Sequence, residues 1–375
     1  MSGWLTALSA RPLGRLVLAW TACGAVLLLA APLGARLAAG RTGLRVLAEF
    51  LGQGERRWLS AGSPAPGRDP VTLPGGAAAD LWRPPGGPPY PPLVLVHGLT
   101  PEGKDDPRLG SAAALLARAG FLVLVPDLPA LRAQRLRPDD AAVVGAALAR
   151  LAREPETLGA PAAIVAVSVG LQPALAAAAN TAGARSVRVV VSLGGFAEAR
   201  ELVRYFTTGA YAFGGLGGRV ALDPALPREF LLSNLDLVRD PAGRDAVEAA
   251  LAGRRLPDTA GTEARAVLAV LENRDPARVD ALLAALPPET RALLDALSPA
   301  RDVRLVPGRL LLVHGRDDPA IPFTESLRLA AAADPRRTRL VLVELLAHVE
   351  GRAPAGRQAR DLVMLWSVVY ELLRA

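Results

Sequence analysis

Cysteine and lysine are nearly absent from this chain of 375 residues. The single cysteine, Cys23, excludes an internal disulfide framework and any zinc site built on cysteines. Lys104 is the only lysine among 43 basic residues, and the arginines that make up the rest never run longer than a pair. Nucleic-acid binding usually needs a clustered basic face. The net charge of +7 therefore indicates a solvated, arginine-rich surface, and no nucleic-acid partner is expected.

Apolar side chains are abundant where cysteine and lysine are scarce. Hydrophobic residues make up 51% of the chain and charged residues 21%, which excludes a disordered protein. At about 150 residues per domain, the length predicts two units, or one large α/β domain with an insertion.

An uncharged stretch of 20 residues, Leu16–Ala35, follows Arg15. A helix rises about 1.5 Å per residue, so this stretch can cross a hydrocarbon core about 30 Å thick. It predicts a membrane-spanning helix within an N-terminal anchor unit, residues 1–60. A cleaved signal peptide is one alternative, because Arg11 and Arg15 form a basic n-region. A buried core helix is another.

Basic residues are more numerous after this stretch than before it. They are Arg36, Arg41, Arg45, Arg56 and Arg57 after it, against Arg11 and Arg15 before it. By the positive-inside rule, this asymmetry favours the cytoplasmic face of the membrane for the C-terminal body. Residues 36–59 also fit a basic interfacial helix lying on either face.

Short, continuously apolar runs recur beyond residue 92. They are Leu93–Val96, Phe121–Val125, Ala162–Val167, Val187–Leu193, Arg309–Val313 and Leu340–Leu346. Strands buried on both faces have this pattern, which is typical of a parallel sheet covered by helices. Two edge strands are expected at Pro70–Leu73 and Ala78–Arg83. The helices are expected at Ser111–Ala119, Pro138–Arg153, Leu171–Ala182, Phe323–Ala333 and Arg357–Arg374. The alternation predicts a doubly wound, mostly parallel α/β sheet over residues 61–196 and 307–375.

Residues 197–306 interrupt this alternation. They contain no convincing strand, and Pro and Gly divide them into several short helical segments. An insertion of this length is too long for an ordinary connection, so we expect it to have its own structure as a helical lid or cap. Its aromatic residues, Tyr205, Phe206, Tyr211 and Phe213, fit either a gate over a substrate or the core of a stable subdomain.

One serine has the sequence context of a nucleophile. The segment Ala166–Gly170, with Ser168 at its centre, follows a buried run and precedes a helix. Small residues are needed two positions before and after such a serine, because the backbone turns sharply there. Ser63 and Ser298 have the same small neighbours, but neither follows a buried run. The pattern therefore predicts Ser168 as the nucleophile.

A serine hydroxyl is a poor nucleophile without a positioned base, and the base needs an acid to orient it. The chain has three histidines, His97, His314 and His348, and each lies at or just after an apolar run. Asp317 and Asp318 follow the fifth buried run, at a carboxyl end, where open α/β sheets build their sites. His97 and His314 are interpreted as hydrogen-bonded structural residues.

Other polar residues at strand ends have a simpler interpretation. Asp127 ends the second buried run and is interpreted as a structural carboxylate. A solvated charged turn is expected for the four residues Glu102, Lys104, Asp105 and Asp106.

Three linked segments resemble the α/β-hydrolase fold family of serine hydrolases. Leu95–Gly98 is similar to the family's His-Gly strand end, and the stretch around Ser168 is similar to its nucleophile elbow. His314–Pro322 resembles the frequent motif His-Gly-x-x-Asp-x-x-hydrophobic-Pro. The resemblance extends over about residues 70–375.

The resemblance implies a catalytic triad in the family's order, Ser168, Asp318 and His348. It places the acid at Asp318 rather than Asp317. It also implies an oxyanion hole formed by backbone N–H groups, at Val169 and at Leu99 in the loop after His97-Gly98. The family commonly carries a helical lid where residues 197–306 lie.

The implied activity is hydrolysis of carboxylic esters through an acyl-enzyme intermediate. The expected substrate is a small-molecule or lipid-like acyl ester, and the chemistry needs neither a metal nor an organic cofactor. The same triad can run amide hydrolysis or acyl transfer. A non-catalytic binding protein with this fold, and a lipid-binding or transport protein, are the alternatives outside catalysis.

Overall fold

A computed structural model describes residues 33–52, 57–180, 187–222, 225–254, 261–347, 350–351 and 358–375. Most of the predicted membrane-spanning stretch and His348 lie outside these ranges. In the part of the chain that is described, no helix is long and apolar enough to cross a membrane.

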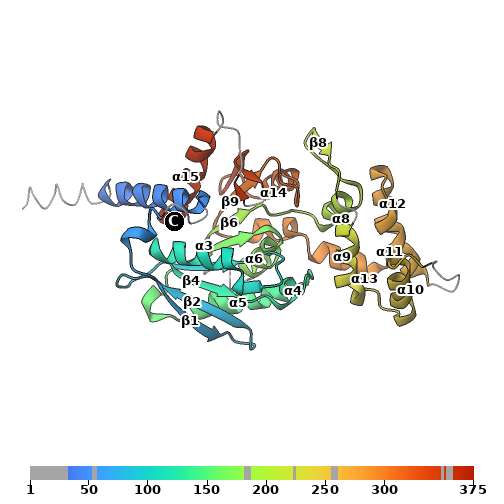
Figure 1. Ribbon diagram of the computed structural model, residues 1–375, viewed down its shortest axis with the longest axis horizontal. Helices are drawn as coiled ribbons and strands as arrows, with labels where there is room; N and C mark the ends of the chain where they lie inside the picture. Colours follow the sequence, from blue (N-terminus) through green and yellow to red (C-terminus); the bar gives the residue numbers. More distant parts are fainter. Residues whose placement is uncertain are drawn as a thin grey trace, which may run out of the picture.

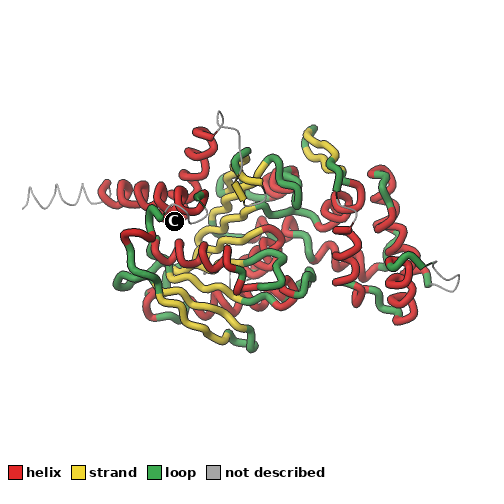
Figure 2. The backbone as a smooth tube through the Cα atoms, in the orientation of Figure 1, coloured by secondary structure: helices red, strands yellow, loops and turns green. Residues whose placement is uncertain are grey.

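The centre of the molecule is an eight-stranded sheet in the order β1-β2-β4-β3-β5-β6-β9-β10 (Figures 1 and 2). Its strands are β1 (Gly67–Thr72), β2 (Ala78–Arg83), β3 (Pro92–Val96), β4 (Leu122–Pro126), β5 (Ala162–Val167), β6 (Val187–Leu193), β9 (Arg309–Gly315) and β10 (Thr338–Val343). Only the pairs β1–β2 and β2–β4 are antiparallel. The predicted mostly parallel α/β sheet is confirmed, with each strand within a few residues of its predicted range.

Helices cover both faces of this sheet, as predicted. They are α3 (Pro107–Arg118), the short α4 (Pro129–Arg132), α5 (Asp140–Leu151), α6 (Leu171–Ala179), α14 (Thr324–Ala332) and α15 (Gln358–Arg374). Alternate residues of β3 enter opposite cores. Val94 and Val96 belong to the core that contains α5, α6 and α14. Leu93 and Leu95 belong to the core that contains α3 and α15.

A helix over residues 33–51 lies across α15 (Figure 1). Trp366 of α15 donates a hydrogen bond from Nε1 to the Gly40 carbonyl oxygen over 2.9 Å. The ring also lies against Gly43, where an added Cβ would be 3.4 Å from Nε1. Leu47 joins the core beneath α15. The second glycine therefore lets the two helices approach closely.

The insertion between β6 and β9 contains α8 (Ala199–Thr208), β7 (Ala210–Phe213), β8 (Leu216–Arg219), α9 (Ala225–Ser233), α10 (Pro241–Leu251), α11 (Thr262–Glu272), α12 (Val279–Ala284) and α13 (Pro288–Ala296). It has small apolar cores of its own, one around Val247 and Leu268 and another around Val279 and Leu283. Asp240 caps α10 by accepting hydrogen bonds from two backbone N–H groups. Pro241 follows in the first turn, where the missing N–H of proline costs the helix nothing.

The expectation that residues 197–306 contain no strand was wrong. β7 and β8 pair as an antiparallel hairpin, with Phe213 opposite Leu216. The two residues between them, Gly214 and Gly215, have φ values of 59° and 79°. A two-residue hairpin turn with positive φ at both positions favours glycine. These two glycines, which were expected only to separate helical segments, therefore form the turn of a short hairpin. A second small hairpin pairs β11 (Leu346–Ala347) with β12 (Glu350–Gly351).

We predict that the sheet core tolerates little loss of volume. Leu312 in β9 is 0% exposed, whereas Leu305 is 62% exposed. Leu312→Ala should lower the free energy of unfolding by about 2–5 kcal/mol, because it removes buried methyl groups and leaves a cavity. Leu305→Ala should change it by no more than about 0.5 kcal/mol. Urea unfolding of both variants checks this, and equal losses would contradict the placement of Leu312.

Candidate active site

Ser168 occupies a sharp turn between β5 and α6. The turn is a single 3-10 segment, Ser168–Gly170, and α6 follows directly. Ser168 has a φ of 54°. This left-handed conformation costs a non-glycine residue about 1–3 kcal/mol and persists only where the surroundings enforce it. Ser168 is therefore the first residue after β5 and lies in a sharp turn, which is the position predicted for the nucleophile.

The end of β3 packs directly against this turn. A Cβ at Gly170 would clash with the carbonyl oxygen of His97, and a Cβ at Gly98 would lie 3.1 Å from the Cβ of Ser168. Gly170 therefore has no room for a side chain, whereas a Cβ at Gly98 would make a tight contact. Leu99 follows Gly98, and Val169 follows Ser168. The structure thus brings the two predicted oxyanion segments to the nucleophile, each within one residue of this contact.

His97 has a structural role, as expected. Its Nε2 accepts a hydrogen bond from the Leu128 N–H over 3.0 Å, and its Nδ1 lies 2.7 Å from the Gly98 carbonyl oxygen. This pattern assigns the proton to Nδ1 of a neutral ring. Burial is the main cause that lowers the pKa of His97. Its ring nitrogens are engaged in holding the loop, so His97 is unsuited to act as the base for Ser168.

The loop that follows His97 is anchored internally. Lys104 forms ion pairs with the buried Asp80 at 3.2 Å and with Asp105 at 2.9 Å. The side chain of Asp127 accepts a hydrogen bond from the Lys104 N–H at 3.1 Å and pairs with Arg132 at 3.1 Å. The structural role predicted for Asp127 is therefore confirmed.

The solvated turn expected in this loop is only partly present. Asp106 is 6% exposed and caps α3 by accepting a hydrogen bond from the Arg108 N–H. Hydrogen bonding from the Arg108 side chain is the main cause that lowers the pKa of Asp106 to about 2. Lys104 and Asp106 are thus internal anchors, because their partners lie in β2 and in the first turn of α3. The ion pair between Lys104 and Asp80 of β2 could not be predicted, because the two residues are 24 positions apart in the sequence.

Asp318, rather than Asp317, is the buried acid after β9. Asp317 is exposed, whereas Asp318 is buried. One oxygen of Asp318 accepts hydrogen bonds from the backbone N–H groups of Ala320 at 2.8 Å and Ile321 at 3.1 Å. Its other oxygen lies 3.4 Å from Nε2 of His314. These contacts fix the carboxylate at the carboxyl edge of the sheet.

His314 is a buried partner of this loop. Its Nδ1 lies 2.7 Å from the Ser326 hydroxyl, and its Nε2 lies 2.9 Å from the Ile321 carbonyl oxygen. Both ring nitrogens therefore have partners within the core. The structural role predicted for His314 is confirmed.

The topology places the predicted nucleophile and the predicted acid at one edge of the sheet. β5, β6 and β9 are parallel neighbours, so Ser168 and Asp318 follow the carboxyl ends of strands separated by β6 alone. His348 lies outside the described residues. Leu346, two positions earlier, is described, and its carbonyl oxygen occupies the space that a Cβ at Gly315 would need. The chain therefore returns to the end of β9 just before His348.

The first helix of the insertion is joined to the acid loop. Tyr205 of α8 is buried and donates a hydrogen bond to the Pro319 carbonyl oxygen over 2.8 Å. Burial, followed by the charge of Asp318, raises the pKa of Tyr205 to about 12. Aromatic contacts extend this junction, with ring centroids 6.2 Å apart for Tyr205–Tyr211 and 6.1 Å apart for Tyr211–Phe323. The predicted aromatic cluster therefore packs against the loop that carries Asp318.

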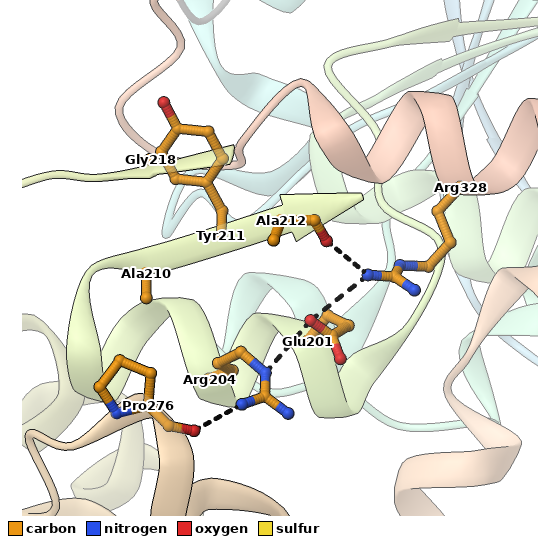
Figure 3. Close-up of a pocket in the computed structure, with 8 residues that line it drawn as sticks. All are labelled: Glu201, Arg204, Ala210, Tyr211, Ala212, Gly218, Pro276 and Arg328. Carbon is orange, nitrogen blue, oxygen red and sulfur yellow. Dashed lines mark hydrogen bonds and ion pairs between the residues drawn. The ribbon is translucent and has the colours of Figure 1, made fainter. Parts of the chain in front are cut away.

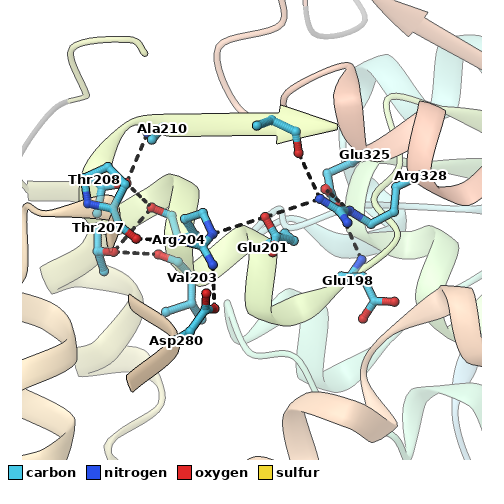
Figure 4. Close-up of polar contacts among 12 residues, drawn as sticks. Glu198, Glu201, Val203, Arg204, Thr207, Thr208, Ala210, Asp280, Glu325 and Arg328 are labelled. Carbon is cyan, nitrogen blue, oxygen red and sulfur yellow. Dashed lines mark hydrogen bonds and ion pairs between the residues drawn. The ribbon is translucent and has the colours of Figure 1, made fainter. Parts of the chain in front are cut away.

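Glu325 anchors the entry to the insertion (Figure 4). This residue of α14 is 2% exposed, and one of its oxygens accepts hydrogen bonds from the N–H groups of Ala197 and Glu198, both at 3.0 Å. Its other oxygen pairs with Arg328 at 3.2 Å. Burial raises its pKa. The sequence analysis missed Glu325, because an acid in the first turn of a helix has no distinctive signal.

An open pocket of about 460 Å³ lies between α8, the β7–β8 hairpin and α14 (Figure 3). Its charged groups are already paired. Glu201 lies 3.3 Å from Arg204 and 3.4 Å from Arg328, and Arg204 also pairs with Asp280 at 2.5 Å. Neither Ser168 nor Asp318 lines this pocket, so it belongs to the insertion rather than to the candidate catalytic centre.

Among the described residues, no group brings three potential ligands from His, Cys, Asp and Glu together.

No protein-family model matches the sequence, and no curated protein matches it. Solved structures do match the fold. The uncomplexed acylaminoacyl peptidase of Pyrococcus horikoshii is 15% identical, with a TM-score of 0.50, over 84% of this chain and 42% of that one. An acylaminoacyl peptidase bound to Z-Gly-Gly-Phe-chloromethyl ketone is 14% identical, with a TM-score of 0.51, over 84% and 43%.

A Pyrococcus furiosus esterase is also similar, at 11% identity and a TM-score of 0.46 over 82% of this chain and 90% of that one. The matched region spans less than half the length of the two peptidases. At these identities, the similarity concerns the fold alone. The chain has the α/β-hydrolase fold.

Burial of neutral His97 predicts a dependence of stability on pH. The unfolded chain protonates His97 below its ordinary pKa of 6.5, whereas burial lowers the pKa in the folded state. The stabilisation is therefore present above that value and is lost as the pH falls towards the lower, folded pKa. One such group gives a slope of up to about 1.4 kcal/mol per pH unit. Urea unfolding between about pH 7.5 and about pH 5.5 should show a smaller slope for His97→Gln. Identical slopes would contradict this role.

The Glu325 anchor predicts a second loss of stability. Glu325→Ala leaves two N–H groups at the start of the insertion without their acceptor, so unfolding should become easier by about 1–3 kcal/mol. Glu325→Gln keeps one acceptor oxygen and should lose less. The matched control is Glu289→Ala, because the Glu289 side chain is 53% exposed. Equal urea midpoints for Glu325→Ala and the control would show that the anchor contributes nothing.

Proposed function

We propose that this protein is a serine hydrolase that cleaves carboxylic esters through an acyl-enzyme intermediate. The observation that carries the proposal is the strained Ser168, with its φ of 54°, in the turn after β5. Strain of this kind gathers at functional sites, where surrounding contacts maintain it. Here the glycine contact with the end of β3 enforces the turn, and Asp318 lies at the same edge of the sheet.

In the proposed mechanism, the Ser168 hydroxyl attacks the ester carbonyl carbon while His348 takes its proton. The carbonyl oxygen becomes an anion, and the backbone N–H groups of Val169 and Leu99 donate hydrogen bonds to it. His348 then gives the proton to the leaving alcohol, and the acyl group remains on Ser168. Water, activated by His348, attacks the acyl-enzyme and releases the acid. Asp318 orients the imidazole and stabilises its protonated form.

Two observations support His348 as the base. The ring nitrogens of His97 and His314 already have partners, which leaves His348 among the three histidines. In addition, the carbonyl oxygen of Leu346 lies against Gly315, three residues before Asp318. A chain that passes this point needs only a short path from Leu346 to bring an imidazole to the carboxylate. The buried Asp318 is better suited than the exposed Asp317 to orient the imidazole of His348.

The same groups can hydrolyse an amide or transfer the acyl group to another acceptor, because the acyl-enzyme is common to these reactions. Comparing the rates of hydrolysis of an ester and of the amide with the same acyl group distinguishes esterase activity from amidase activity. Added alcohols or amines reveal transfer, because the acyl group then appears on the acceptor instead of on water.

We predict that Ser168→Ala abolishes labelling by a fluorophosphonate probe and lowers kcat for ester hydrolysis by about 10⁴–10⁶, since triad residues act as a unit. Ser63→Ala is the matched control, because Ser63 has the same small neighbours without a preceding buried strand. The control variant should label and turn over like the unmodified protein. Asp318→Asn should lower kcat by about 10⁴.

Residual turnover in Ser168→Ala close to that of the control would refute the assignment of the nucleophile. Failure of the unmodified protein to label, when the insertion admits the probe, would favour a binding role for the fold. Circular dichroism of each variant separates loss of catalysis from loss of folding.

A further inference from the structure

The helix over residues 33–51 has one apolar face that no described residue covers. Leu33, Leu37 and Leu44 are 58%, 61% and 57% exposed. Intervals of four and seven residues place them on a single face of the helix. Val46 and Leu47, each 6% exposed, lie on the face that packs onto the protein. The exposed leucines are therefore additional to the contacts that hold this helix in place.

Arginines border this leucine face. Arg36, Arg41 and Arg45 are exposed, and within the described part of the chain none of them forms an ion pair. Arg204 and Arg328 differ in this respect, because each of them forms ion pairs with two acidic residues. The chain has no acidic residue before Glu49. Arginine is therefore the only charged residue type on the part of the helix that carries the exposed leucines.

Neighbouring segments add apolar groups to the same end of the molecule. Trp58 is 59% exposed. Glu49 holds the segment that follows Trp58, because its carboxylate accepts hydrogen bonds from the Leu59 N–H at 2.7 Å and the Ser60 N–H at 3.0 Å. On α15, Val363 is 64% exposed, and Leu362, one turn before Trp366, is 39% exposed. Tryptophan is enriched at the boundary between a bilayer and water. These exposed groups thus belong to α15 and to the segment that Glu49 anchors, next to the helix in the sequence or packed against it.

We propose that the leucine face of the helix over residues 33–51 docks on the surface of a bilayer that contains anionic lipids. A basic helix with a separate apolar face is the form that lies in the plane of a membrane interface. The arginines fit anionic headgroups, whereas a neutral protein surface would leave them uncompensated. In the sequence, the uncharged stretch Leu16–Ala35 overlaps the start of this helix, and its length is the one predicted to suit a membrane span.

This docking surface lies at the end of the molecule opposite the insertion (Figure 1). The contact of Trp366 with Gly40 and Gly43 transmits the position of the helix to α15 and so to the sheet. A docked helix would therefore orient the whole domain relative to the bilayer, in addition to tethering it. The proposal is independent of the reaction that Ser168 carries out.

The test uses the full chain with Cys23→Ser, labelled with the environment-sensitive fluorophore NBD at a single introduced cysteine. One variant carries Leu44→Cys, and the matched control carries Leu305→Cys, since these leucines are 57% and 62% exposed. Both are reconstituted into vesicles of brominated phosphatidylcholine and phosphatidylserine. The label at position 44 should lose most of its fluorescence to the brominated lipid and resist quenching by aqueous iodide. The label at position 305 should show the reverse.

Removing the charges tests the electrostatic part. Each arginine near an anionic surface contributes a factor of about five to binding, so Arg41→Gln with Arg45→Gln should weaken docking about 25-fold. Quenching by brominated lipid at position 44 should then approach that at position 305, and vesicles without phosphatidylserine should act in the same direction. Arg278→Gln, at an exposed position in the insertion, should leave the quenching unchanged.

Two results would overturn the proposal. A label at position 44 that is as accessible to iodide as the label at position 305 would show a face open to water. A label shielded from iodide but not quenched by brominated lipid would show that a second copy or another protein covers the leucines. Quenching that the arginine substitutions leave unchanged would refute the role of charge. Circular dichroism confirms that each variant is folded.

Discussion

The candidate site depends on one close contact between backbones, at the ends of β3 and β5. The carbonyl oxygen of His97 occupies the space that a side chain at Gly170 would need, and a Cβ at Gly98 would lie only 3.1 Å from the Cβ of Ser168. Two glycines therefore allow a turn that a larger residue would open. Ser168, with its left-handed backbone, lies at this contact, and so does the start of the loop after β3. Close backbone packing thus brings together the segments of the predicted nucleophile and the predicted oxyanion hole.

The acid side of the site has a second function, which is to hold the insertion. The loop after β9 contains Asp318, accepts the hydrogen bond of Tyr205 and leads into α14, where Glu325 anchors the backbone of the insertion. The first helix of the insertion is therefore joined to the segment that positions the acid. Together with the small apolar cores of the insertion, these contacts favour a stable subdomain over a loosely attached flap.

The arginines of this protein fall into groups that composition cannot separate. Arg204 and Arg328 lie in networks with acidic partners around the junction with the insertion. Arg41 and Arg45 lie beside exposed leucines on the helix that crosses α15. A paired guanidinium contributes to internal structure, whereas an unpaired one beside apolar groups adds affinity for an anionic surface. If the proposed docking holds, the same residue type serves opposite ends of the molecule in different ways.

Local patterns in the sequence were sufficient for the sheet, its covering helices and the turn at Ser168. Continuous apolar runs report burial on both faces, and a small-residue turn after such a run reports a sharp bend, so each signal lies within a few neighbouring residues. The β7–β8 hairpin was missed because its strands are short and glycine-rich.

The motif around His314 already favoured Asp318 over Asp317, and the structure adds that Asp318 is the buried one. Only the tertiary structure paired Lys104 with Asp80 and assigned Glu325 to the insertion. Both contacts join residues that are 24 or more positions apart. A long-range hydrogen bond or ion pair produces no periodic pattern in the sequence, because its partners come together only when the chain folds.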